Sequence, residues 1–175
     1  ALANEYRAIH EAGHVLQIDS PDLAMERHRF FGHLDERAFL KQLELHVAAI
    51  NAGIAGIPRD RVRLHVCWGN SPSPRNHDID LEKIFPSVLR AKAGAIMLPF
   101  ANGRHAHEYK VLQKLPLTQD QILLAGVIDT LTNVIEHPET VADRLERVAA
   151  VIGDPRRVMA STDCGLETSA GGSAV

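Results

Sequence analysis

The sequence has few cysteines, no excess of basic residues and no long apolar run, and so lacks three features that would place it in a specialised class of protein. Among its 175 residues there are only two cysteines, Cys67 and Cys164, and basic residues do not outnumber acidic ones, since 19 Lys and Arg face 22 Asp and Glu. Two cysteines are too few for a disulfide scaffold, so we expect a reducing, cytoplasmic setting. No apolar run reaches the roughly eighteen residues of a membrane-spanning helix. The formal net charge of −3 argues against binding nucleic acid through its phosphates.

What the sequence does have is a regular alternation of short apolar runs and helical patterns. Apolar residues recur at steps of three and four in the longest helical pattern, for example Leu43, Val47 and Ile50. Helices are predicted at 1–12, 35–52, 80–92, 104–113 and 138–152. Strands are predicted at 15–19, 61–68, 95–98, 121–129 and 157–163. Five strands that alternate with helices predict an α/β protein with a parallel sheet.

The carboxyl ends of the predicted strands favour a barrel over an open sheet. No glycine-rich phosphate-binding fingerprint follows any strand, which removes the usual reason to expect a nucleotide-binding open sheet. Polar and reactive residues stand at nearly every strand end, as in the active sites of βα barrels. They are Asp19, His65, Cys67, Asn102, Asp129, Asp163 and Cys164.

The length then makes the predicted barrel incomplete, because a full (β/α)8 TIM-type barrel needs about 250 residues. We expect residues 1–175 to be the C-terminal part of one catalytic barrel domain and to hold its last five strands. The three earlier strands would come from an upstream segment or from a second chain. The small-residue stretch 169–175 is expected to be a flexible tail.

His65 and Cys67 form the sharpest local pattern. Residues two apart on a strand point to the same face, so imidazole and thiol converge. Cys164 ends the last strand, and the strand ends of a barrel meet at one mouth. One nitrogen and two sulfur ligands suit zinc, and catalytic zinc sites commonly keep three protein ligands and one open position. The alternative is that these are ordinary buried cysteines, because free cysteine is among the most buried residue types.

The segments around these residues resemble the catalytic barrel of the cobalamin-independent methionine synthase superfamily. The main matches are 65–70, His-Val-Cys-Trp-Gly-Asn, and 161–166, Ser-Thr-Asp-Cys-Gly-Leu. Supporting matches are 17–19, 102–105 with 107–108, and 126–129 leading to 136–139. The nearest branch is the short single-barrel one that includes epoxyalkane:coenzyme M transferase.

The resemblance implies a βα barrel and assigns roles to four residues. His65, Cys67 and Cys164 take the places of zinc ligands, and Asp19 falls where the synthases hold their amino acid substrate. Members of the superfamily activate a thiol on zinc and alkylate it. The implied cofactor is Zn²⁺, and the implied partners are a small-molecule thiol and an alkyl donor.

The sequence departs from the family pattern at two positions. Pro99 stands where the family usually carries a zinc-ligating Glu, and proline cannot coordinate a metal. Leu131 stands where the synthases place a general-acid His. The first change leaves three protein ligands, or a site completed by a neighbour such as His105, or no tight metal. The second puts the use of a methyl-folate in doubt.

Five further residues are candidates for the site. We expect Asp129 and Asn102 to bind substrate and Trp68 to stack on a ligand. Asp163 would orient the neighbouring metal ligand, Cys164, without binding the metal itself. His105 would support the site in the same way from its loop. Each of these residues also has a structural alternative. In that alternative Asp129 satisfies loop amides, Trp68 packs in the core, Asp163 caps a turn and His105 lies in a solvated loop.

These patterns lead to one main hypothesis and two alternatives. The main hypothesis is zinc-dependent alkyl (methyl) transfer to a thiol. The first alternative is a barrel that binds a small molecule or a metal without transferring alkyl groups, as Pro99 and Leu131 suggest. The second is a metal-independent lyase or decarboxylase that uses Asp19 and Asp129. None of these assigns a catalytic acid or base.

Overall fold

The centre of the molecule is a five-stranded parallel sheet in the order β1-β2-β3-β4-β5. The computed structural model describes residues 1–71 and 74–166, so the predicted tail at 169–175 lies outside the described residues. Each strand falls on its predicted range, which confirms the α/β class. The strands are β1 Leu16–Ser20, β2 Val62–Val66, β3 Ala95–Pro99, β4 Ile122–Ile128 and β5 Val158–Thr162.

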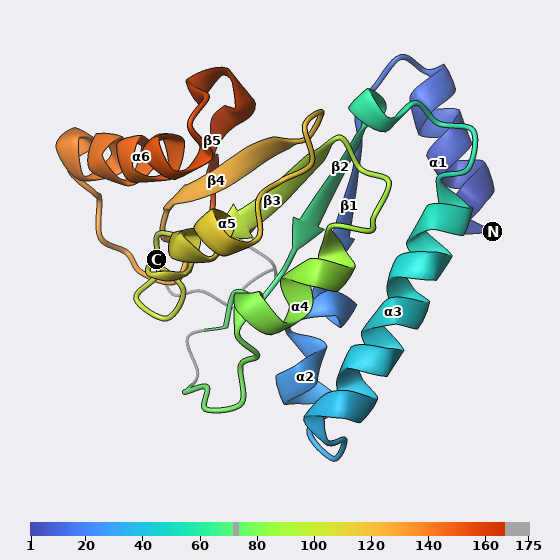
Figure 1. The fold of residues 1–175 in the computed structure, drawn as a ribbon, viewed down its shortest axis with the longest axis horizontal. Helices are drawn as coiled ribbons and strands as arrows, with labels where there is room; N and C mark the ends of the chain where they lie inside the picture. The colour runs from blue at the N-terminus through green and yellow to red at the C-terminus, as the bar shows by residue number, and fades with distance from the viewer. Residues whose placement is uncertain (72–73, 167–175) are drawn as a thin grey trace.

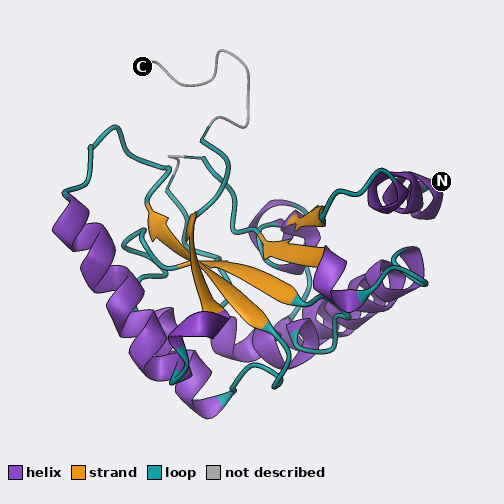
Figure 2. Cartoon of the chain, turned by 90° about the horizontal axis from the view of Figure 1, so that it is seen from above, coloured by secondary structure: helices purple, strands orange, loops and turns teal. Residues whose placement is uncertain are grey.

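Helices connect the strands and lie together on one side of the curved sheet (Figures 1 and 2). The α-helices are α1 Leu2–Glu11, α2 Glu26–Arg29, α3 Glu36–Gly53, α4 Leu81–Val88, α5 Val111–Lys114 and α6 Pro138–Ile152. Short 3-10 turns are η1 Pro21–Leu23, η2 Arg59–Arg61, η3 Glu108–Lys110 and η4 Pro155–Arg157. Repeated strand-helix units with all strands parallel are the building pattern of βα barrels.

The two faces of the sheet bury different residues, because side chains alternate along a strand. Val62, Leu64 and Val66 of β2 point to the helices and belong to the main core. The other face of the sheet carries His65 on β2 and a small separate cluster that includes Met97. This second face is concave and is the interior face of a partial TIM barrel. Among the described residues, β1 and β5 each pair with a strand on one side only.

Two predicted helices differ from the structure. The prediction of one helix over 104–113 was wrong: turns are followed by η3 and by the single turn of α5. The helix predicted at 80–92 begins at Leu81 but ends at Val88. Asp80 precedes α4, yet its side chain makes no capping hydrogen bond. Glu108 of η3 takes that role, because its Oε1 accepts a hydrogen bond of 2.6 Å from Leu81 N.

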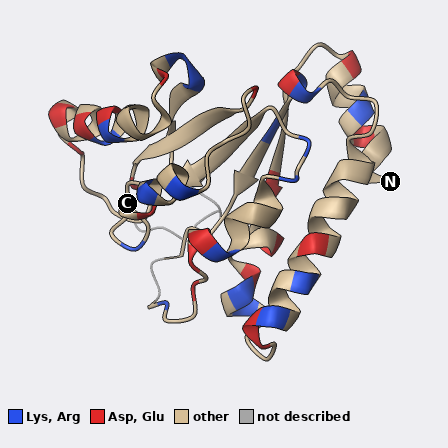
Figure 3. Cartoon of the chain, viewed as in Figure 1, with Lys and Arg blue, Asp and Glu red and all other residues tan. Residues whose placement is uncertain are grey.

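Charges of both signs are spread over the outer helices. In Figure 3, Lys and Arg lie among Asp and Glu along α3 and α6, while the strands carry few charges. No described helix is long and apolar enough to span a membrane.

Candidate metal centre

The three predicted metal ligands come together at the carboxyl edge of the sheet. His65 lies on β2, Cys67 follows it directly, and Cys164 lies just past the end of β5. β2 and β5 are three strand spacings apart in the sheet order, which would be about 14 Å in a flat sheet. The Sγ atoms of Cys67 and Cys164 are nevertheless 3.5 Å apart. The curvature of the sheet therefore creates the site.

The spacing of the ligand atoms fits a zinc ion. One ligand atom from each of His65, Cys67 and Cys164 lies within 4.8 Å of the other two. Both cysteines are free thiols, and their separation of 3.5 Å is too long for a disulfide. It is close to the roughly 3.8 Å expected between two sulfurs on one tetrahedral zinc with Zn–S bonds of about 2.3 Å. The three residues are only 4%, 4% and 8% exposed, so a bound ion would be shielded from water.

The orientation of His65 supports the same conclusion. Its Nδ1 lies 3.1 Å from the Sδ of Met97, whereas its Nε2 is buried and has no hydrogen-bond partner among the described residues. A buried polar atom without a partner is rare in folded proteins. The tautomer that carries the proton on Nδ1 leaves the Nε2 lone pair free, which is the form that binds a metal.

The two thiols ionise differently because each is the hydrogen-bond partner of the other. The hydrogen bond from Cys67 lowers the pKa of Cys164, and His65 acts in the same direction. The same contact with Cys164, together with burial, raises the pKa of Cys67. The backbone N–H of Gly69 donates to Cys67 Sγ at 3.2 Å, which favours negative charge on that sulfur. The first proton therefore leaves this pair more easily than the second, and a divalent cation would favour loss of the second proton.

Asp163 fixes the position of Cys164 by binding the loop after β3. Its carboxylate accepts hydrogen bonds from the backbone N–H groups of Phe100, Ala101 and Asn102 at 3.0, 3.0 and 2.7 Å, and from Asn102 Nδ2 at 2.8 Å. Burial raises the pKa of the Asp163 carboxyl, while the hydrogen bonds from Ala101 and Asn102 oppose that rise. The predicted alternative, a simple turn cap, does not describe these contacts between two strand ends.

Pro99 ends β3 beside Cys164, where it borders a small pocket. Trp68, Asn102 and Leu131 also line this pocket. The lining supplies no carboxylate beyond Asp163, which is already bound to the loop after β3. The lining of this pocket therefore supplies no fourth protein ligand in place of Pro99.

The remaining predicted residues are placed as follows. Trp68 is 3% exposed and donates from Nε1 to the carbonyl of Ile79, so most of its ring packs in the core. Asn102 Oδ1 accepts from the next loop amides, including His105 N at 3.2 Å. Asp129 accepts from Leu131 N at 2.9 Å, the structural contact given as its alternative.

Asp19 has the most accessible position among the predicted substrate-binding residues. It is exposed at the end of β1 and is paired in register with His65 of the neighbouring strand. Burial of part of the side chain raises the pKa of the Asp19 carboxyl, whereas the charge of His65 lowers it. Asp19 therefore lies on the concave face next to the three ligands.

His105 is not one of the three clustered ligand residues, and the alternative that it lies in a solvated loop was wrong because its side chain is buried. It is 3% exposed, and its ring centre lies 4.8 Å from that of Trp68. Its Nδ1 is 2.7 Å from Glu108 Oε2, and its Nε2 is 3.5 Å from Asp78 Oδ2. Burial by itself would lower the pKa of His105, but these two carboxylates raise it overall. His105 thus supports Trp68, the residue that follows Cys67.

Sequence reasoning missed the carboxylates around His105. Burial alone would raise the pKa of Asp78, but the hydrogen bond with His105 and the charge of Arg104 lower it overall. Arg104 forms an ion pair with Asp78, and Glu108 is 5% exposed. The sequence signal was the spacing of His105 and Glu108, which are three residues apart and meet on one turn.

Comparison with known proteins gives a consistent family. The family model described as the cobalamin-independent synthase catalytic domain matches residues 1–175. A 2-hydroxypropyl-CoM lyase from Xanthobacter autotrophicus is 26% identical, over 69% of this chain and 38% of that protein. A methionine synthase from Thermococcus kodakarensis is 28% identical, over 95% of this chain and 41% of that protein. The chain thus spans about 40% of the length of these curated relatives.

A solved structure has the same fold. The B12-independent methionine synthase from Shewanella sp. W3-18-1, in complex with selenomethionine, superposes with a TM-score of 0.63 and 22% sequence identity. The match covers 94% of this chain and 46% of that protein. The described sheet therefore corresponds to part of a methionine synthase barrel.

Proposed function

Because the chain belongs to the cobalamin-independent synthase catalytic-domain family, we propose that it carries the metal centre of a zinc-dependent alkyltransferase that acts on a thiol. The observation that carries this proposal is the meeting of His65, Cys67 and Cys164 within 4.8 Å, with His65 Nε2 left without a partner. Zinc bound there would hold a substrate thiol as its thiolate near neutral pH, and the thiolate is the nucleophile. The sulfur then forms a bond to the alkyl carbon while the bond from that carbon to its leaving group breaks.

The protein side chains have distinct tasks in this proposal. His65, Cys67 and Cys164 would supply three ligands and leave a position for the substrate sulfur beside Pro99. Trp68 and Asn102 would line the small pocket at that position. Asp19 would bind a polar group of the thiol substrate, because it is exposed beside His65 on the concave face.

Leu131 narrows the choice of alkyl donor. It lines the small pocket but has no proton to give, whereas the resemblance would place a general acid there. The leaving group must then depart without a proton from this residue. We propose a donor whose leaving group is stable as an anion, or one that takes its proton from water.

Zinc content and thiol consumption test this function in the full-length protein. We expect one zinc per site in the wild type, loss of zinc in His65→Ala and Cys67→Ala, and retention in His107→Ala, an exposed control in a nearby loop. Cys164→Ser should abolish consumption of thiol with a methyl donor or an epoxide. Zinc unchanged in both ligand variants would overturn the proposal.

Two outcomes would favour the other hypotheses. Stoichiometric zinc without any thiol consumption would favour a metal-binding barrel that performs no alkyl transfer. Full turnover in the presence of a chelator would favour a metal-independent lyase or decarboxylase.

We also propose that further strands complete the barrel, from an upstream segment or from a second chain. The exposed edges of β1 and β5 in the described sheet support this, because unpaired parallel edges leave backbone groups without partners. A monomeric 175-residue protein with a cooperative thermal transition would contradict it.

A further inference from the structure

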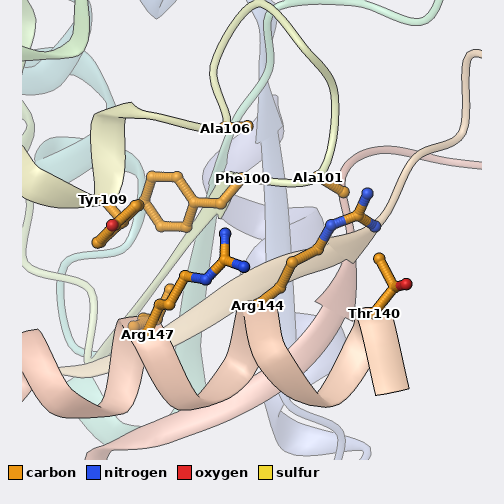
Figure 4. Close-up of a pocket in the computed structure, with 8 residues that line it drawn as sticks. Phe100, Ala101, Ala106, Tyr109, Thr140, Arg144 and Arg147 are labelled. Atoms are coloured by element: carbon orange, nitrogen blue, oxygen red, sulfur yellow. The ribbon is translucent and has the colours of Figure 1, made fainter. Parts of the chain in front are cut away.

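A second cavity lies outside the metal centre, between α6 and the segment that follows β3 (Figure 4). Its volume is about 250 Å³. One water occupies about 30 Å³ in the liquid, so the cavity has room for about eight waters or for one small organic molecule. Its wall includes Phe100 and Tyr109 on one side and the α6 residues Thr140, Arg144 and Arg147 on the other.

The cavity is separate from the metal centre. Phe100 and Ala101 form its wall, and their backbone N–H groups donate to Asp163, which precedes Cys164. None of the three proposed zinc ligands lines the cavity. The backbone of 100–101 therefore divides one site from the other.

Two arginines on successive turns of α6 give the cavity its charge. Figure 4 shows the side chains of Arg144 and Arg147 rising from α6 toward Phe100 and Ala101. Arg144 is anchored, because its Nη1 donates to the carbonyl of Val127 at 2.8 Å and to Glu136. Both of its hydrogen bonds within the described part of the chain use Nη1, so Nη2 and Nε remain for a ligand.

Arg147 supplies the weakly compensated positive charge. Its nearest carboxylate is Asp143, and the ion pair of 3.8 Å is too long for a hydrogen bond. The Arg147 and Asp143 side chains are 61% and 60% exposed, so this pair holds Arg147 weakly. Glu136 already balances Arg144, and the cavity therefore has roughly one positive charge to offer.

The rest of the wall suits an apolar group. Phe100 is 3% exposed and Val148 is 1% exposed, and Tyr109 packs against the main core. A small molecule that combines a planar apolar body with one oxyanion matches both parts of the wall. We propose that this cavity binds a small carboxylate, whose two oxygens are held by Arg144 and Arg147 and whose apolar body lies against Phe100.

Calorimetric titration of the full-length zinc-loaded protein with benzoate tests the proposal. We expect saturable binding of benzoate, and none of benzamide, which has the same shape without the charge. Arg147→Gln should weaken binding about fivefold, as expected for loss of one partly exposed charged contact. Asp143→Asn should strengthen binding, because it removes the competing carboxylate.

Controls separate this cavity from other sites that bind anions. Arg156→Gln, at an 88% exposed arginine that does not line the cavity, should bind benzoate as the wild type does. Cys164→Ser should also keep benzoate binding, whatever its effect on zinc. The proposal is overturned if benzoate does not saturate, if Arg147→Gln binds as tightly as the wild type, or if inorganic phosphate binds and benzoate does not.

Discussion

Replacement of Asp163 by Asn tests how the metal centre is held in place. The Asp163 carboxylate accepts four N–H groups, all from residues 100–102. Oδ1 accepts from Phe100 and Ala101, and Oδ2 accepts from Asn102 twice. Asn has nearly the same shape, but one of its two terminal groups donates instead of accepting. Two of the four donors therefore lose their partner and face another donor.

The expected cost follows from these contacts. Asp163 is 4% exposed, so water cannot replace the lost partners. Hydrogen bonds to charged groups contribute about 1.5–3 kcal/mol each, so losing two costs about 3–6 kcal/mol. This is a large part of the roughly 5–15 kcal/mol by which domains are stable. With a urea slope of about 2 kcal/mol/M, the midpoint of unfolding should fall by about 1.5 M or more.

Urea unfolding of the full-length protein measures this change, with Asp143→Asn as the matched control. Asp143 is an exposed carboxylate on α6 and should leave the midpoint nearly unchanged. Asp163→Asn should also weaken zinc binding, because Cys164 follows Asp163 directly. A midpoint equal to that of the control would refute the reasoning, since it would mean that the four contacts do not hold the β5 end to the β3 loop.

Two further predictions concern neighbouring parts of the site. Gly126→Ala should lower the free energy of unfolding in urea by about 1–3 kcal/mol. The reason is that a Cβ at this position would lie 2.1 Å from Asp163 Oδ1. Gly103→Ala is the control, because a Cβ there would have no atom within 4 Å, and it should show no comparable loss. The raised pKa of His105 predicts that this residue stabilises the folded protein fully at pH values below about 6.5, the pKa of histidine in the unfolded chain. This contribution is lost as the pH rises through the higher pKa that His105 has in the folded protein. Asp78→Asn should lower the pKa of His105 in an NMR titration, and an unchanged value would contradict the role of Asp78.

The strands and the long helices could be predicted from the sequence because their signals are local. Alternation on β2 and the apolar steps of α3 each depend on side chains within a few residues. The segment 104–113 could not be predicted in this way. There the structure is decided by distant partners, since Asn102 binds Asp163 and Glu108 caps α4 at Leu81.

The candidate ligands could also be predicted, but their supporting contacts could not. His65 and Cys67 share a strand face, and Cys164 ends another strand. Both of these signals can be recognised from the sequence alone. Asp78 lies in a loop with nothing around it to suggest burial, yet it is only 15% exposed in its contact with Arg104. Polar clusters of this kind depend on how two segments far apart in the sequence meet, and no local pattern in the sequence indicates that.

The distance between Cys67 and Cys164 depends on the curvature of the sheet and not on either strand alone. β3 and β4 lie between β2 and β5, and a flat sheet would hold the two sulfurs far apart. Gly126 lets β4 and β5 approach closely enough for Asp163 to reach the loop after β3. The contacts that bring the two thiols to 3.5 Å are therefore hydrogen bonds and close approaches between strand ends. It follows that the ligand geometry should respond more to Asp163 and Gly126 than to any apolar residue of the helices.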